Sequence, residues 1–272
     1  MSGQAKPPSR FTRVFASTFR IVRSDAAFFG AVWAAYVAAN CGVYFLSASL
    51  NGQTRGQFGL WLAGAQLAAS ILLPALLYAV IGMRMRLGDD PRIDEILPRA
   101  LRLAAPMAVI TAIPMTGRLL ILAASAFNAV PDVRAAGLMG AAAGAFGWVA
   151  FMIFGLAPAA LTMRERGALA ALAASERLLR GNRWLLLGIP SALGLGEALL
   201  ALPATLPNLA RLLGGAGNVL AADAIMSPIG AEVYLQALNG LYAVLLTVAL
   251  WHLCEILAGR STPSAETLEV FD

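Results

Sequence analysis

The chain has 272 residues, of which 59% are hydrophobic and only 13% are charged, and its formal net charge at pH 7 is +5. A soluble domain carries about 25% charged residues, so this composition excludes an ordinary soluble domain and predicts a membrane protein. The positive charge is interpreted as a topology signal and as a source of attraction for anionic lipid headgroups. No nucleic-acid partner is expected.

Six apolar segments are long enough to cross a hydrocarbon core of about 30 Å, which takes about 20 helical residues. They cover residues 26–46, 59–83, 103–127, 135–163, 184–206 and 233–257. Helices are required because an unsatisfied backbone facing lipid is costly. The predicted fold is therefore all-α, with a single six-span domain over residues 1–260 and a disordered cytoplasmic tail over residues 261–272.

Fifteen of the twenty basic residues form three clusters of five, which precede the first, third and fifth spans. The clusters are Lys6, Arg10, Arg13, Arg20 and Arg23; Arg84, Arg86, Arg92, Arg99 and Arg102; and Arg164, Arg166, Arg177, Arg180 and Arg183. The alternate connectors carry one basic residue each: Arg55, Arg134 and Arg211. Because Lys and Arg are enriched in cytoplasmic connectors, both termini are predicted to be cytoplasmic. Nineteen of the basic residues are Arg, which is typical of a GC-rich bacterial genome and indicates the bacterial inner membrane.

Each basic cluster is interleaved with apolar residues at helical spacing. These residues are Phe11, Val14, Phe15, Thr18, Phe19 and Val22 within residues 9–24; Ile93, Ile96, Leu97, Ala100 and Leu101; and Leu169, Leu172, Ala173, Leu178 and Leu179. The pattern predicts three amphipathic helices that lie in the cytoplasmic interface. Arg23, Arg102 and Arg180 recur about every 80 residues, which favours three tandem hairpin repeats. Any hairpin protein that obeys the positive-inside rule would show the same period.

Ionisable residues inside a membrane are candidates for function. Arg118 in the third span and Glu197 in the fifth lie at similar estimated depths, so an ion pair between them is predicted, as a structural contact or a substrate site. The structural role is favoured. His252 and Glu255 lie one turn apart near the cytoplasmic end of the last span, where a hydrogen-bonded pair is favoured over a proton relay.

Small and helix-breaking residues recur within the spans. Gly140 and Gly144 form a GxxxG pattern in the fourth span, which predicts close helix packing. Pro114 in the third span and Pro190 in the fifth lie near the depth of Glu197. Interrupted spans of this kind bind substrate in many transporters, so these prolines leave a transport function open.

The segment over residues 168–188 carries the most distinctive pattern in the chain. It resembles a conserved segment of bacterial six-helix membrane proteins, namely the membrane domain fused to glycerophosphodiester phosphodiesterases and stand-alone YciC-type proteins. The matching residues are Ala171, Leu172, Ser175, Leu178, Gly181, Leu187 and Gly188. The resemblance implies an integral membrane domain and no phosphodiesterase activity, since no such domain accompanies it here. Gly181 is also expected to end a helix in an αL conformation.

No catalytic motif accompanies these features. The sequence lacks a Gly-x-Ser-x-Gly, a His-Glu-x-x-His and a P-loop pattern. One histidine and two cysteines, Cys41 and Cys254, do not make a zinc site, and no cofactor is expected. The predicted function is a non-enzymatic membrane domain that acts through lipids or through a partner protein at the cytoplasmic face. The alternative is the permease subunit of an ABC-type transporter, in which residues 84–99 would contact an ATPase.

Overall fold

The computed structural model describes residues 9–51, 57–88, 91–117, 119–121, 133–164, 167–214 and 228–259. These residues form helices joined by turns and short loops, and no strand occurs among them. Six helical segments within these ranges are long and apolar enough to span a membrane. The all-α, multi-pass membrane architecture predicted from the composition is therefore found.

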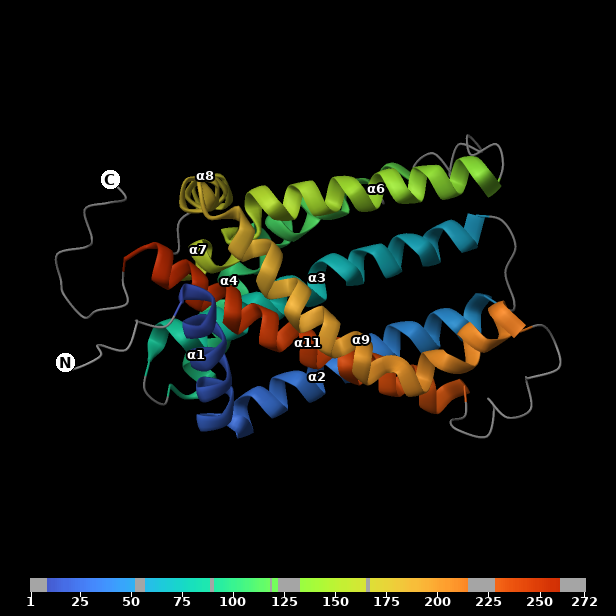
Figure 1. The fold of residues 1–272 in the computed structure, drawn as a ribbon, viewed down its shortest axis with the longest axis horizontal. Coiled ribbons are helices and arrows are strands. Elements are labelled where there is room, and N and C mark those ends of the chain that lie inside the picture. Colours follow the sequence, from blue (N-terminus) through green and yellow to red (C-terminus); the bar gives the residue numbers. More distant parts are fainter. Residues whose placement is uncertain are drawn as a thin grey trace, which may run out of the picture.

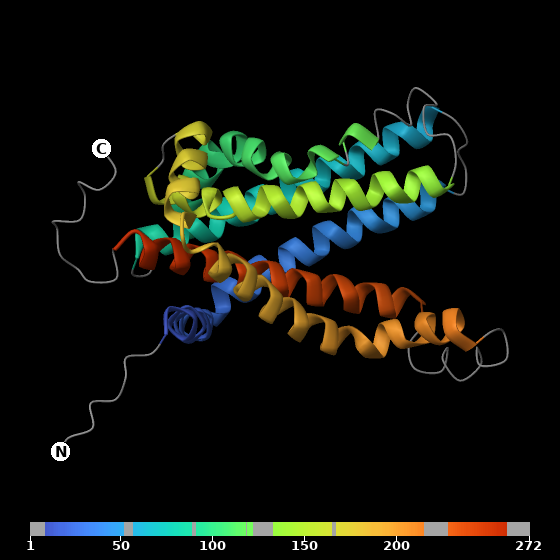
Figure 2. The same cartoon turned by 45° about the horizontal axis from the view of Figure 1, so that its top comes forward.

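The helices follow in chain order. They are α1 (Arg10–Ser24), α2 (Ala26–Asn51), α3 (Gln57–Leu87), α4 (Ile93–Ala112), η1 (Ile113–Met115), α6 (Val133–Phe154), α7 (Ala157–Arg164), α8 (Ala168–Leu179), α9 (Arg183–Gly214) and α11 (Pro228–Leu257). The candidate spans are Ala26–Ser49, Leu62–Leu87, Ile93–Met115, Leu138–Arg164, Arg183–Thr205 and Ile229–Leu257. The long helices run side by side, whereas α1 and α8 lie across them at one end of the bundle (Figures 1 and 2).

The first short helix, α1, packs one face onto the bundle. Its residues Val14 and Thr18 are fully buried, and Phe11 contacts α9 beside Gly188. The Ser9 hydroxyl caps the helix by accepting a hydrogen bond from the Thr12 amide at 3.2 Å. The helix ends at Ser24, and Asp25 forms the corner to α2. A short helix with this apolar spacing therefore forms before the first span.

The second short helix is not separate, and the prediction of a distinct helix before the third span is wrong. The segment that contains Ile96 and Ala100 forms the first turns of α4, which continues without a break to Ala112. Both of these residues are buried in the core, while Ile93 and Leu101 on the same helix are exposed. No glycine separates the segment from the span, and the helix continues through Pro98 and Pro106, which lie inside it. The predicted third span therefore begins about ten residues too late.

The fourth predicted span is broken where one continuous helix was expected. Helix α6 ends at Phe154, and α7 begins at Ala157 after a turn at Gly155 and Leu156. Pro158 has no amide hydrogen to continue the ladder of hydrogen bonds. A side chain at Gly155 would meet the Phe151 carbonyl at 2.7 Å. These two residues therefore redirect the chain at the end of α6.

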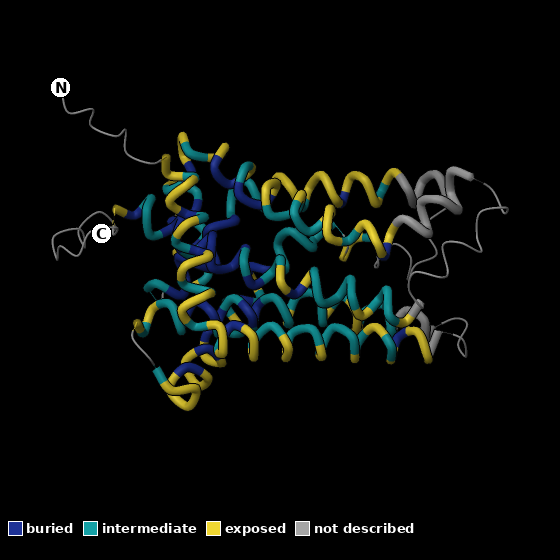
Figure 3. Tube along the Cα trace, turned by 60° about the horizontal axis from the view of Figure 1, so that its bottom comes forward, coloured by how far each residue is buried: buried dark blue, intermediate teal, exposed yellow. Residues whose placement is uncertain are grey.

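The core lies at the end of the bundle where α1 and α8 cross the spans. Helix α7 forms its centre, since every residue from Ala157 to Thr162 is buried. The last turns of α3 and α11 and the first turns of α9 pack around it. Figure 3 shows buried residues concentrated at this end, while the outward faces of the long helices are exposed. This distribution fits spans whose outer faces are covered by lipid.

Candidate functional site

The described members of the three basic clusters lie on the helices that meet at this end, which is called the arginine-rich end from here on. It comprises Arg10, Arg13, Arg20, Arg23, Arg84, Arg86, Arg92, Arg99, Arg102, Arg164, Arg177, Arg180 and Arg183. The described turn after α1 and the final turn of α11 lie here too (Figure 1). The ends of the spans that face the single basic connectors lie at the opposite end.

Some of these arginines are committed to contacts within the chain. Arg84 forms an ion pair with Asp25 at 2.7 Å, and Arg86 donates to the Thr162 carbonyl at 3.3 Å. Arg10 donates to the Asn182 side chain at 3.1 Å, which joins α1 to the turn between α8 and α9. These contacts hold α1 and the ends of α3, α7 and α9 together. These three arginines of the basic clusters therefore have a structural role.

A second group of arginines points outward. Its members are exposed and make no ion pair with another described residue; they are Arg13, Arg20, Arg23, Arg99, Arg102 and Arg183. They come from α1, α4 and the start of α9, which are far apart in sequence. Positive charge at a membrane surface attracts anionic lipid headgroups. Among the described residues, these six arginines thus give the arginine-rich end an exposed positive surface.

The distinctive segment over residues 168–188 builds the junction next to these arginines. Ser175 on α8 is fully buried beside the break between α6 and α7. Its hydroxyl accepts a hydrogen bond from the Leu156 amide at 3.2 Å and donates to the Ile153 carbonyl at 3.3 Å. A buried amide without a partner is costly. Ser175 therefore has a structural role, because it satisfies the backbone that the break leaves open.

Glycines position the other end of the same segment. Gly181 has φ +82° and follows the C-cap residue of α8, as an αL termination requires. Gly188 on α9 lies against α1, where an added Cβ would meet the Phe11 ring at 3.2 Å. The other residues of the segment are divided between core and surface: Ala171 is buried, Leu172 and Leu178 are half-buried, and Leu187 is exposed. Several of the residues that carry the resemblance therefore position α8 and the start of α9 against the neighbouring helices.

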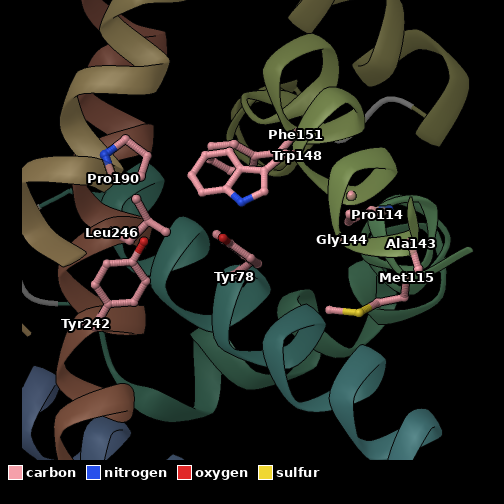
Figure 4. A pocket seen from close by; sticks show the side chains of 11 residues that line it. Tyr78, Pro114, Met115, Ala143, Gly144, Trp148, Phe151, Pro190, Tyr242 and Leu246 are labelled. Carbon is pink, nitrogen blue, oxygen red and sulfur yellow. The ribbon is translucent and has the colours of Figure 1, made fainter. Parts of the chain in front are cut away.

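A cavity of about 390 Å³ lies within the spans, between α6 on one side and α9 with α11 on the other. It is called the chamber here. Its lining is Tyr78, Pro114, Met115, Ala143, Gly144, Gly147, Trp148, Phe151, Pro190, Tyr242 and Leu246. The rings of Tyr78, Tyr242 and Trp148 surround the space from three helices (Figure 4). Its volume lies in the range of about 300–1,000 Å³ that is typical of small-molecule sites.

The chamber is closed towards the arginine-rich end. There, the turn after α6 contacts α9, since a Cβ at Gly155 would come within 2.9 Å of Leu186. Beyond this contact the two helices diverge (Figure 2). Gly144 and Trp148 line the chamber and are exposed as well. The chamber therefore opens sideways, at a depth where lipid surrounds the spans.

A second cavity of about 160 Å³ adjoins the chamber, because both are lined by Tyr78, Pro114, Met115 and Phe151. Pro74 and Pro158 line this smaller cavity, and Pro190 lines the chamber. Prolines from four helical segments thus surround one continuous region. Pro74 and Pro190 each remove a hydrogen bond from a helix interior, whereas Pro114 and Pro158 lie in the first turn of their helical segments, where a new segment begins.

Polar groups form the smaller part of the chamber wall. The Tyr78 side chain lies close to that of Thr247, whose hydroxyl donates to the Ala243 carbonyl at 2.7 Å. Tyr242 packs against α9 at Gly194, where a Cβ would lie 3.8 Å from its ring, and it interacts electrostatically with Glu197. The remaining lining is apolar or aromatic. The chamber therefore suits an apolar ligand better than a charged one.

The structure places the ionisable residues predicted within the spans as follows. Glu197 is half-buried on α9 near Tyr242, while Arg118 lies outside the described residues, and with it the predicted pair. His252 and Glu255 come together at the arginine-rich end, with His252 Nδ1 3.1 Å from Glu255 Oε2. The other ring nitrogen, Nε2, is buried without a hydrogen-bond partner among the described residues.

The GxxxG pattern does not pack against another helix within the part of the chain that the structure describes. Gly140 and Gly144 are exposed, and a Cβ at either position would meet nothing within 4 Å. Close packing of α6 occurs instead at Gly147, which lies against the Pro114 carbonyl, and at Ala143, which lies against Gly117. Helix periodicity explains the difference, because residues 143 and 147 share the inward face and residues 140 and 144 flank it.

Sequence reasoning did not single out the aromatic residues of the chamber. Tyr78, Trp148 and Tyr242 lie in three different spans, and nothing in their local sequence indicates that they meet. The only available signal was the set of prolines, which mark the spans that leave space. Comparison of the chain with protein-family models, curated proteins and solved structures finds no match.

Proposed function

We propose that this chain is a non-enzymatic integral protein of the bacterial inner membrane that binds anionic phospholipid at its arginine-rich end, with that end in the cytoplasm. A single observation carries the proposal: α1, α4 and the start of α9 present exposed arginines at one end of the bundle. The resemblance of residues 168–188 to six-helix bacterial membrane domains supports the same class of function. No chemical step is part of the proposal.

The electrostatics favour headgroup binding over a purely topological role. A basic residue near an anionic membrane surface contributes about 1 kcal/mol, so three exposed arginines together contribute about 3 kcal/mol. Helix α1 is held to the bundle by Phe11 and Arg10. Its arginines therefore keep a fixed position relative to those of α4 and α9. A fixed arrangement of positive charge can bind an individual anionic lipid headgroup, in addition to attracting anionic lipids to the surface in general.

Native mass spectrometry of the purified protein in a mild detergent tests this proposal. The protein is supplied with equal amounts of phosphatidylglycerol and phosphatidylcholine. We expect retained phosphatidylglycerol in the wild type and severalfold less in the triple variant Arg13→Gln, Arg20→Gln and Arg23→Gln.

The matched control removes the same charge elsewhere, through Arg55→Gln, Arg134→Gln and Arg211→Gln. This control is expected to retain the lipid. Equal retention in both triple variants, or equal loss from both, would contradict the proposal. Bound protein partners appear in the same spectra as larger masses, so the interpretation through a partner protein is tested at once.

A transport function is the second candidate, and the proline-lined chamber favours it. Interrupted spans around a central cavity are a feature of transporters. In the permease alternative, residues 84–99 contact an ATPase, and the described residues of this segment lie mainly at the end of α3 and the start of α4. Transport of an amphipathic solute by reconstituted protein, abolished by Glu197→Gln with folding intact, would establish this second function.

A further inference from the structure

We infer that the chamber between α6 and α9 holds one acyl chain of an anionic phospholipid whose headgroup lies at the arginine-rich end. This inference deepens the proposed function and rests on it for the identity of the headgroup. It adds a site for the hydrocarbon chain within the spans. The site is defined by Gly144, Trp148, Pro190, Tyr78 and Tyr242.

The position of the chamber fits a lipid that enters from the side. Its opening lies between α6 and α9, and α9 begins with Arg183 and Trp184, which are both exposed. Pro190 follows Arg183 by seven residues, which is about 10 Å along a helix. A lipid with its headgroup at the level of Arg183 would thus place the part of its acyl chain nearest the headgroup beside the chamber.

The chemistry of the wall fits a hydrocarbon chain. The lining is dominated by Met115, Phe151, Leu246 and the prolines, with tyrosine and tryptophan rings between them. Because the wall is more apolar than polar and none of its lining residues is charged, a hydrocarbon chain fits it better than a charged solute, which would find no counter-charge there.

Charge complementarity selects the anionic lipid among those of the bilayer. Arg183 is exposed at the first residue of α9 and has no ion pair with another described residue. Arg180, the C-cap residue of α8, is exposed as well, although it is paired with Glu176 at 3.3 Å. A zwitterionic lipid brings its own positive group to this surface, so it gains less from these arginines than an anionic lipid does.

The test uses phosphatidylglycerol that carries a photoactivatable diazirine in its acyl chain. The full-length protein is reconstituted into phosphatidylcholine vesicles that contain this probe, illuminated and digested, and the labelled residues are identified by mass spectrometry. We expect labelling of Tyr78 and Tyr242, which lie on the wall of the chamber. Labelling confined to outward positions such as Leu138, with none at these tyrosines, would overturn the inference.

The chain offers a matched pair of variants on α6. Gly144→Leu adds a side chain at a position that lines the chamber, whereas Gly140→Leu adds the same side chain one turn away, outside the chamber lining. Labelling of Tyr78 and Tyr242 should fall severalfold in Gly144→Leu and stay at the wild-type level in Gly140→Leu. Unchanged labelling in a folded Gly144→Leu variant would contradict the inference.

Competition in the wild-type protein keeps the test decisive even where a variant does not fold. Unlabelled phosphatidylglycerol should suppress labelling of the two tyrosines more strongly than the same amount of added phosphatidylcholine. Equal suppression would mean that bulk lipid fills the chamber, and the inference would fail. Failure of the proposed function is a separate result, namely retention of phosphatidylglycerol by the α1 arginine variant in native mass spectrometry.

Discussion

Asp25 and Arg84 form the ion pair that joins the corner between α1 and α2 to the end of α3. Arg84 Nε and Nη2 both approach Asp25 Oδ2 at 2.7 Å, and the guanidinium carbon lies 5.8 Å from the centre of the Phe28 ring. Arg84 also donates to the Gly88 carbonyl. The two side chains are only 16% and 27% exposed. Arg84 therefore belongs to the packing of this corner and differs from the outward-facing arginines.

Replacement of Asp25 by Asn should loosen this corner. A half-buried guanidinium would lose its counter-ion, at a cost of about 1–3 kcal/mol, between the values for surface and buried pairs. We expect a lower unfolding temperature in detergent and faster hydrogen exchange in α1. Asp94→Asn is the control, because its partner Arg92 is 3.6 Å away and both side chains are exposed. An equal loss of stability in both variants would contradict this account of Asp25.

Removal of the Ser175 hydroxyl should destabilise the break between α6 and α7. Ser175→Ala leaves the buried Leu156 amide without its partner, which costs about 1–3 kcal/mol. Thermal unfolding measures the effect. Ser24→Ala removes an exposed hydroxyl that bonds only to the carbonyl of Ile21 among the described residues, so it should change stability little. A Ser175→Ala variant as stable as the wild type would show that the hydroxyl does not support the break.

The contact between α3 and α7 should not tolerate a methyl group at Gly82. A Cβ there would lie 2.5 Å from Thr162 Cγ2, and Thr162 is fully buried. We expect Gly82→Ala to lower the unfolding temperature, because overpacking of a core costs about 1–3 kcal/mol. Gly64→Ala on the same helix meets nothing within 4 Å. It should be neutral or stabilising, since alanine favours helix over glycine. The reverse order of stabilities would refute the close contact.

The orientation of the protein in the membrane can be determined from two serines, one just before α2 and one near its end. Ser24 and Ser49 are both exposed and lie near opposite ends of the helix. With Cys41 and Cys254 replaced by alanine, an impermeant maleimide added to spheroplasts should label Ser49→Cys. It should label Ser24→Cys only after the membrane has been opened. Labelling of Ser24→Cys in intact spheroplasts would reverse the proposed topology.

The class of fold was predictable from the sequence because lipid restricts what a chain may do within it. Long apolar runs must be helices, and the segments so identified overlap the six candidate spans found in the structure. The short helix before the first span was also predictable, since Val14 and Thr18 recur at helical spacing and are the residues that become buried. The αL conformation of Gly181 followed from its position after a helix.

The structure differs from the sequence-based predictions where one local sequence signal competes with another. Apolar spacing around Ile96 and Ala100 predicts a separate helix, but the helix continues through Pro98 and Pro106 into the span. Conversely, Gly155 and Pro158 divide a run that hydropathy reads as continuous. The chamber could not be predicted, because its residues come from α3, η1, α6, α9 and α11. Only the packing of these helices brings the lining residues together, and no pattern in the local sequence indicates this packing.

The most direct test of the central claim is a density map of the protein in nanodiscs of phosphatidylglycerol, determined by electron cryo-microscopy with a bound antibody fragment. Lipid binding at the arginine-rich end predicts a headgroup density beside Arg183 that continues as a narrow acyl density into the chamber, in contact with Tyr78. A chamber closed by α6 packed directly against α9, with no lipid density at Arg183, would contradict the claim.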